Sequence, residues 1–232
     1  MINNWLDIIQ PVCVLCQTPT KAVAGLCEHC LRLIPTLGDG CRQCASPLEP
    51  GNSRQLICGN CLREPPAFDR VSSLFAYAHP VDYLVQQMKF HARLDIARCF
   101  GTLLAARLTN EVNSVDALLP VPLHVTRLRQ RGFNQALEIA RPIARQHHLP
   151  IITTPCVRRL ATTSQSDLPL HKRRQNVRNA FQLTGVVPYR RVAIIDDVMT
   201  TGQTAHSLSL TLKQHNVEHV QVWSCARTIL DK

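Results

Sequence analysis

Long apolar runs and glycine-rich loops are both missing from this sequence. No apolar segment approaches the ~18 residues that a membrane-spanning helix needs, so we expect no membrane span. The nine glycines are scattered, and no G-x-x-x-x-G-K-S/T motif is present, which excludes a P-loop nucleotide site. The first ten residues lack a basic segment and contain Asp7. We therefore expect a cytoplasmic protein without a signal peptide.

Acidic and aromatic residues are also scarce. Sixteen acidic residues face 26 Lys and Arg, giving a formal charge of +10, and aromatic residues make up 5% of the chain. The imbalance is concentrated in residues 120–191, where thirteen basic side chains are opposed only by Glu138 and Asp167. Such an Arg-rich segment suits a multiply phosphorylated small molecule or a nucleic acid, and a solvated basic surface is the simpler alternative. Because only three aromatic residues lie in the same range, base stacking is weakly supported.

Cysteine, in contrast, is abundant. Eight of the eleven cysteines occur before residue 62, in four Cys-x-x-Cys knuckles. Two knuckles supply four thiolates, which complete a tetrahedral zinc site with no open position, so we predict two structural zinc ions. Disulfides and an iron–sulfur cluster are the alternatives. The predicted ligands are Cys13, Cys16, Cys27, Cys30, Cys41, Cys44, Cys58 and Cys61.

The knuckles form an internal repeat. Ten residues separate the first two knuckles and thirteen the last two, which favours sequential pairing. A crossed arrangement, in which the first knuckle joins the third, stays open. Few apolar residues lie between the knuckles, so metal binding must supply much of the folding energy of this module. Since Glu64-Pro65-Pro66 breaks the pattern, we predict a zinc module at residues 1–66 and a second domain at 67–232.

In the second domain, segments typical of strands alternate with segments typical of helices. This order predicts an α/β fold with a doubly wound, mostly parallel sheet, whose ligands bind beyond the carboxyl ends of the strands. Pro142 should end or kink its helix. The predicted strands are 71–78, 115–121, 151–157, 181–184, one beginning at 192, and 217–226. The predicted helices are 81–91, 94–113, 132–148 and 202–215, and the polar segment 158–175 should be a long loop.

Residues 192–204, V-A-I-I-D-D-V-M-T-T-G-Q-T, carry most of the functional argument. An apolar strand runs into two carboxylates, and a loop rich in hydroxyls then leads into a helix. A Walker B strand looks similar but requires the missing P-loop. The glycine lets backbone N–H groups approach a phosphate, the threonines add donors, and the helix contributes its positive end.

This stretch resembles, position by position, the signature of type I phosphoribosyltransferases, which binds phosphoribosyl pyrophosphate (PRPP). The resemblance implies that the acids hold the ribose 2′- and 3′-hydroxyls and that the loop holds the 5′-phosphate. The fold it implies is type I phosphoribosyltransferase-like, with a small N-terminal Cys-rich zinc module. The residues so assigned to PRPP are Asp196, Asp197, Val198, Met199, Thr200, Thr201, Gly202, Gln203 and Thr204.

The chain as a whole is similar to the ComF/GntX branch of that superfamily. The similarity rests on the knuckles, on Met88-Lys89-Phe90, on Pro120 to Leu123 and on Arg131 to Gln135. It implies a pyrophosphate-contacting loop at Pro120, Val121, Pro122, Leu123 and His124, and a flexible lid over 158–175. Further candidates for the pyrophosphate or lid contacts are Lys89, Arg131, Asn134, Gln135, Arg158, Gln165, Arg173 and Asn176.

The resemblance further implies displacement of pyrophosphate from PRPP with Mg²⁺, by positioning and electrostatics. We identify no general base or other catalytic residue. The acceptor would be a nucleobase or an amine, and a variable hood over residues 68 to about 112 would select it. The branch is associated with uptake or use of external DNA, so a non-catalytic protein that binds PRPP or single-stranded DNA is the alternative. The third hypothesis is that the zinc module is a docking surface for a protein partner.

Overall fold

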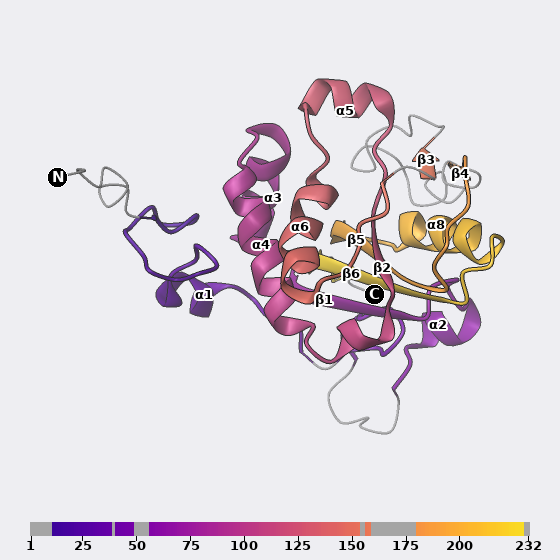
Figure 1. Cartoon of the computed structure of the whole chain (residues 1–232). Coiled ribbons are helices and arrows are strands. Elements are labelled where there is room, and N and C mark those ends of the chain that lie inside the picture. Colours follow the sequence, from indigo (N-terminus) through magenta and orange to yellow (C-terminus); the bar gives the residue numbers. More distant parts are fainter. Residues whose placement is uncertain (1–10, 39, 49–55, 154–155, 159–179, 230–232) are drawn as a thin grey trace.

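The computed structural model describes residues 11–38, 40–48, 56–153, 156–158 and 180–229. Four parallel strands form its central sheet in the order β1-β6-β5-β2 (Figure 1). Ile151 adds a parallel bridge to Leu118 at the β2 edge. The mostly parallel α/β sheet expected from the sequence is thus confirmed. Its strands are β1 (Arg70–Ala76), β2 (Ala117–Pro120), β5 (Arg191–Met199) and β6 (His219–Arg227).

Helices cover both faces of the sheet. Helices α3 (Val81–Phe90), α4 (Leu94–Arg107) and α6 (Gln135–His147) lie on one face and α8 (Gln203–Lys213) on the other (Figure 1). The alternation of β5 explains this arrangement, because successive side chains of a strand point to opposite faces. Ala193 and Ile195 belong to the core beneath α3, α4 and α6, whereas Val192 and Ile194 belong to the core beneath α8.

The cysteine-rich segment is divided between these two cores. Its short helices are α1 (Glu28–Leu33), which begins within the second knuckle and contains Cys30, and α2 (Gly59–Arg63), which begins within the fourth and contains Cys61. Cys13 and Cys30 lie in the core of α3, α4 and α6, and Cys41 and Cys61 lie in the core of α8. Between them the chain crosses the outer edge of β1, where the Ala76 N–H donates to the Pro35 carbonyl at 2.9 Å. This connection covers an edge strand that would otherwise expose backbone groups.

Two predicted helices have different ends in the structure. The helix predicted over 94–113 stops at Arg107, and a 3₁₀ turn, η2 (Glu111–Ser114), follows it. Thr109 and Asn110 favour helices weakly, but Val112 is buried and continues the apolar spacing, which explains the overlong prediction. The helix predicted from 132 begins at Gln135. Pro142 lies inside α6 without ending it, because tertiary packing outweighs the hydrogen bond that proline removes.

Helix α5 (Val125–Arg131) was missed. It has no buried residue, so it produces no apolar period for the sequence to reveal. The residues that begin and end this helix can nevertheless be recognised in the sequence. His124 caps its amino end, and Gly132 follows its carboxyl end with a φ of 78°, in the left-handed region where glycine is favoured.

The predicted strand over 151–157 is wrong. Ile151 makes only an isolated bridge, and Cys156–Arg158 forms β3, which pairs antiparallel with β4 (Phe181–Leu183) in a separate small sheet. Residues 154 and 155, which lie between these two segments, are outside the described part of the chain. The loop predicted over 158–175 lies outside the described residues, except for Arg158. Within the described part of the chain, no helix combines the length and apolar character needed to cross a membrane.

Candidate functional site

Two acids occupy the carboxyl-terminal part of β5. The strand continues through Asp196 and Asp197 to Met199, so the acids lie within the strand and not beyond its edge. Asp197 is buried with 4% of its surface exposed. Since successive side chains leave opposite sides of a strand, the two carboxylates face different surroundings.

Helices α3 and α6 supply the partners of Asp197. The Lys89 ammonium, in the last turn of α3, lies 2.8 Å from Asp197 Oδ2, and Gln135 Nε2, at the start of α6, donates to the same oxygen at 3.3 Å. The Asp197 Oδ1 accepts from the Val198 N–H at 2.7 Å. Lys89 and Gln135 were both predicted to contact pyrophosphate or a lid. In this structure they hold the second acid of the pair.

The two acids differ in proton affinity. Burial and the neighbouring charge of Asp197 raise the pKa of Asp196 to about 8. Burial also opposes the charge of Asp197, but the Lys89 ammonium outweighs it and lowers the pKa of that carboxyl. In turn, Asp197 raises the pKa of Lys89 despite the burial of its side chain. The surroundings therefore favour the ionised forms of Lys89 and Asp197 and disfavour the charge of Asp196.

A tight loop follows the acids and leads into α8. Gly202 has a φ of 79° and immediately precedes Gln203, the first residue of α8. The left-handed conformation favours glycine here, whereas the nearest atom to an added Cβ, the Met199 Cε at 2.9 Å, ends a flexible side chain that could move. The loop comprises residues 200–204, and we call it the phosphate loop because the sequence predicts that it holds a phosphate. Its position at the start of an 11-residue helix gives it N–H groups and the positive end of the helix dipole.

The predicted pyrophosphate loop lies directly beside the acids. Pro120 ends β2 in register with Ile195, and the Val121 N–H donates to the Ile195 carbonyl at 2.9 Å. Asn134 fixes this loop from the start of α6, because its side-chain amide donates to the Val121 carbonyl at 3.1 Å. His124 accepts from the Thr126 N–H at 3.3 Å and so begins α5.

Arginine side chains reach the site from α5 and β3. The Arg131 guanidinium lies 5.6 Å from the centre of the Phe90 ring, and the Arg158 guanidinium lies 5.5 Å from that of Phe181. Burial lowers the pKa of both guanidinium groups, while Asp197 acts in the opposite direction on Arg131 and Asp196 does so on Arg158. Both stay charged, and both lie within electrostatic reach of the acids. The other candidates, Gln165, Arg173 and Asn176, lie outside the described residues.

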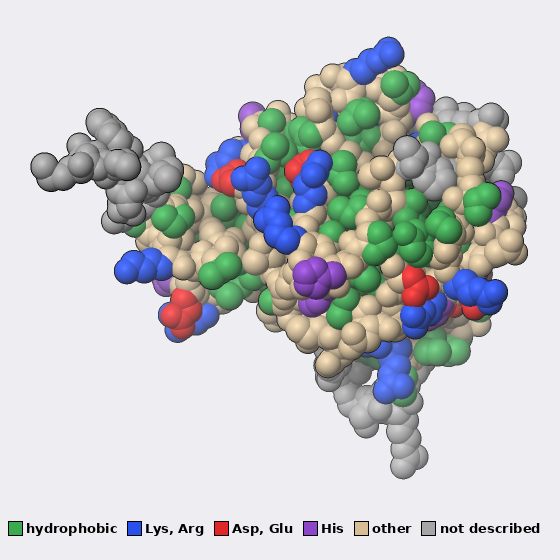
Figure 2. All heavy atoms as spheres, in the orientation of Figure 1, with side chains coloured by type: hydrophobic (Ala, Val, Ile, Leu, Met, Phe, Trp, Pro, Cys, Tyr) green, Lys and Arg blue, Asp and Glu red, His purple; other side chains and the backbone are tan. Residues whose placement is uncertain are grey.

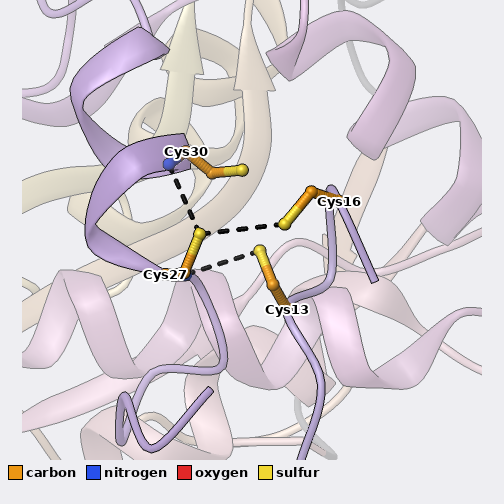
Figure 3. A group of neighbouring side chains, drawn as sticks. All are labelled: Cys13, Cys16, Cys27 and Cys30. Atoms are coloured by element: carbon orange, nitrogen blue, oxygen red, sulfur yellow. Dashed lines mark hydrogen bonds between the residues drawn. The ribbon is translucent and has the colours of Figure 1, made fainter. Parts of the chain in front are cut away.

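The eight predicted zinc ligands form two clusters. In each cluster four Sγ atoms lie within 4.8 Å of one another, and Figure 3 shows the first of them, at Cys13, Cys16, Cys27 and Cys30. The Cys16–Cys27 and Cys44–Cys58 sulfur separations are 3.8 and 3.7 Å. A tetrahedral zinc ion with Zn–S bonds of about 2.3 Å requires about the same spacing. The sites fit structural zinc, and the knuckles pair sequentially.

The two clusters also share a backbone arrangement. The Cys27 N–H donates to the Cys13 Sγ at 3.4 Å, and the Cys58 N–H donates to the Cys41 Sγ at 3.3 Å. Such hydrogen bonds stabilise thiolates. The internal repeat seen in the sequence is therefore repeated in three dimensions.

Sequence reasoning missed Arg227. This residue ends β6 with 3% of its surface exposed, and its guanidinium donates to the carbonyls of Met199 and Thr200 at the phosphate loop. The only signal was a basic residue at the end of a predicted strand that is buried along most of its length.

Together these features define a class of protein: a double zinc ribbon joined to a doubly wound parallel α/β unit, with an acidic pair in the carboxyl-terminal part of β5 and a tight loop before α8. The Double zinc ribbon domain family matches residues 6–62. The chain is 35% identical to Competence protein F of Haemophilus influenzae, over 93% of this chain and 96% of that protein. It is also 35% identical to DNA utilization protein YhgH of Escherichia coli O157:H7, over 94% of this chain and 97% of that protein.

A more distant relative is Competence protein ComFC of Bacillus subtilis, at 25% identity over 81% of this chain and 76% of that protein. The identity and coverage of the first two relatives decide the family. The chain belongs to the family of Competence protein F and DNA utilization protein YhgH.

Proposed function

We propose that this protein binds PRPP with Mg²⁺ at the carboxyl ends of β2 and β5 and transfers the phosphoribosyl group to an acceptor. The observation that supports this is the register of the two strands. Pro120 lies opposite Ile195, so the Pro120–His124 loop, the acids and the phosphate loop line one edge of the sheet. The three groups that we assign to pyrophosphate, to the ribose hydroxyls and to the 5′-phosphate are thus adjacent.

In the proposed reaction the bond between ribose C1 and the pyrophosphate oxygen breaks, and both electrons leave with pyrophosphate. A nitrogen of the acceptor, a nucleobase or an amine, forms the new bond to C1 and loses a proton. Asp196 and Asp197 would accept hydrogen bonds from the ribose hydroxyls, and Arg131 and Arg158 would neutralise the leaving group. Mg²⁺ bound together with PRPP would supply positive charge that stabilises the departing pyrophosphate.

The biological setting we propose is the uptake or use of external DNA. Two of the relatives are named competence proteins, and others are named DNA utilization proteins. Phosphoribosyl transfer to a base released from degraded DNA would fit that setting. We also propose the zinc ribbons as a docking surface for a protein partner, and residues 1–66 and 67–232 as the two domains.

Calorimetric titration with PRPP and MgCl₂ tests the binding proposal. The double variant Asp196→Asn/Asp197→Asn should weaken PRPP binding by at least about 100-fold, because two charge-assisted hydrogen-bond acceptors are lost. Asp116→Asn is the matched control, since that carboxylate pairs with Arg191 at the opposite end of β5 and should leave the affinity unchanged. Unchanged affinity in the double variant would refute the proposal. Pyrophosphate release with a panel of nucleobases and amines then tests transfer.

Single-stranded DNA is the second candidate ligand, supported by the names of the relatives and by the basic excess between residues 120 and 191. On the face shown in Figure 2, Lys and Arg side chains lie in separate groups with hydrophobic surface between them. The same titrations with an oligonucleotide at 50 and 200 mM salt separate the candidates. DNA affinity should fall steeply with salt if phosphate contacts dominate. A flat response would exclude the basic side chains as the DNA site.

A further inference from the structure

Arg227 connects the second zinc centre, which consists of Cys41, Cys44, Cys58 and Cys61, to the phosphate loop. On the zinc side its Nε donates to the Cys44 carbonyl at 3.0 Å, and a terminal nitrogen donates to the Ser46 hydroxyl at 2.9 Å. On the loop side its other terminal nitrogen donates to the Met199 carbonyl at 3.1 Å and to the Thr200 carbonyl. One buried guanidinium thus joins a zinc ligand to the backbone that begins the loop.

The segment after the fourth knuckle reaches the same loop from another side. The Ala67 N–H donates to the His206 Nδ1 at 3.1 Å, in the first turn of α8. The Phe68 ring lies 3.6 Å from the position that a Cβ on Gly202 would take. Both contacts are made by residues within seven positions of the zinc ligand Cys61. The second centre therefore contacts the loop through two independent routes.

Charge explains why a buried arginine suits this position. Its partners in the structure are carbonyl and hydroxyl oxygens, which carry no net charge. A zinc ion bound by four thiolates is a net anion, and Cys44, which supplies one of these thiolates, also supplies one of the carbonyls. Zinc binding thereby places a negative centre beside the buried cation and lowers the cost of its burial.

We propose that Arg227 is a positioning residue that couples zinc binding at the second centre to ligand binding at the phosphate loop. With zinc in place, Arg227 holds the Met199 and Thr200 carbonyls away from the ligand, so that the N–H groups of the loop face a phosphate. The first centre packs in the core on the other face of the sheet and has no such connection among the described residues. The coupling rests on the proposed function, because PRPP is the phosphate ligand it concerns.

Zinc release provides the first test, because coupling between two ligands is reciprocal. The protein with both zinc ions is mixed with a zinc-selective chromophoric chelator, with and without PRPP and Mg²⁺. PRPP should slow one of the two release phases by at least about fivefold and leave the other unchanged. The variant Cys16→Ser, which removes an exposed ligand of the first centre, identifies the phase. Its remaining zinc should be the one that PRPP protects.

PRPP affinity provides the second test. Arg227→Met, which removes the hydrogen bonds but keeps an unbranched side chain, should weaken PRPP binding at least about tenfold in protein that still holds two zinc ions. Arg227→Lys should recover part of the loss, and Cys16→Ser should bind PRPP with wild-type affinity. If Arg227 had a merely structural role, Arg227→Met would change both phases of zinc release, and the positive charge of Arg227→Lys would not restore PRPP affinity.

The outcomes separate the two proposals. If the wild-type protein binds no PRPP, the proposed function fails and the coupling fails with it. If PRPP binds but slows neither phase, or binds equally to zinc-loaded Arg227→Met, the coupling alone is overturned. If Arg227→Met does not fold, the zinc-release measurements on the wild-type and Cys16→Ser proteins still test the coupling.

Discussion

Asp196 is a carboxyl group held where its charge is disfavoured. Its pKa is raised to about 8 by burial and by the charge of Asp197, which is itself held ionised by Lys89. A ligand that donates hydrogen bonds to both acids would favour their ionised forms. The unliganded protein therefore carries a stability cost at the site where binding is proposed, which is a common property of binding and active sites.

The substitution Asp196→Asn should stabilise the unliganded protein, increasingly so as the pH rises. Between the ordinary carboxyl pKa and about 8 the native state holds a proton that the unfolded state has lost, so stability falls as pH rises through this interval. The amide that replaces the carboxyl group does not titrate, so the variant would avoid this loss. We expect a gain of about 2 kcal/mol at pH 8.5, or about 5 °C in Tm, and a smaller gain at pH 5.5.

Differential scanning calorimetry at several pH values checks this prediction, with Asp116→Asn as control. Arg191 lowers the pKa of Asp116, so the charged form of this carboxyl is favoured in the folded protein. Asp116→Asn should therefore not stabilise the protein at any pH above the range in which ordinary carboxyl groups titrate. If the two variants show the same pH dependence, the environment inferred for Asp196 is wrong.

Single residues of the site differ in how far the sequence reveals them. The acids and the phosphate loop are adjacent in the chain, and their order within one strand–loop–helix unit carries the signal. Lys89 was predicted as a candidate for pyrophosphate or lid contacts. Its place beside Asp197 arises from the packing of α3 on the sheet, and no local sequence pattern indicates a contact between residues so far apart in the chain. Arg227 has contacts at residues 44, 46 and 199, and only the folded chain brings these together.

Among the elements, the crossing of α4 and α6 depends on the absence of one side chain. A Cβ at Gly101 would lie 2.4 Å from the Ile139 carbonyl oxygen and 2.9 Å from the Pro142 Cγ. The two helices can therefore approach closely only with glycine at this position. The same contact shows why Pro142 is tolerated inside α6, because its ring packs against α4.

Gly101→Ala should destabilise the protein although alanine is the better helix former. The propensity gain of up to about 1 kcal/mol is smaller than the cost of separating two packed helices, so we expect a net loss of about 2 kcal/mol, or about 5 °C in Tm. Gly59→Ala, in α2, is the matched control, since nothing lies within 4 Å of its added Cβ. Chemical denaturation of both variants gives the comparison. If Gly101→Ala and Gly59→Ala have the same free energy of unfolding, the close approach of α4 and α6 at Gly101 would be contradicted.

The helices and strands also show where sequence patterns predict structure correctly. Elements with many buried residues, such as α3, β5 and β6, produced apolar patterns that placed them within a few residues. Helix α5 has no buried face and gave none. In the predicted strand over 151–157 the described residues have different partners, because Ile151 forms a bridge to β2 and Cys156 and Val157 belong to the small β3–β4 sheet. Strand pairing decides such cases, and pairing is a property of the whole fold.

For the whole molecule, the zinc ribbons cover the α/β unit on two sides. The first centre contributes cysteines to the core of α3, α4 and α6, the second to the core of α8, and the connection between them covers the edge of β1. Metal binding supplies folding energy to the ribbons, and the ribbons complete both cores. The stability of the α/β unit should therefore depend on zinc, even though the sequence predicts a domain boundary at residue 66.

Removal of zinc should lower the stability of the entire chain. We expect two zinc ions per chain by elemental analysis, and a loss of about 4 kcal/mol or more, or about 10 °C in Tm, after chelation. Cys27→Ser and Cys58→Ser, each at one centre, should each lose one zinc and each lower the Tm, because each uncovers one face of the sheet. Calorimetry shows whether the loss is shared by a single transition. If the α/β unit melts at an unchanged temperature after chelation, while only a small separate transition disappears, the ribbons are independent of the sheet and the shared cores do not contribute to its stability.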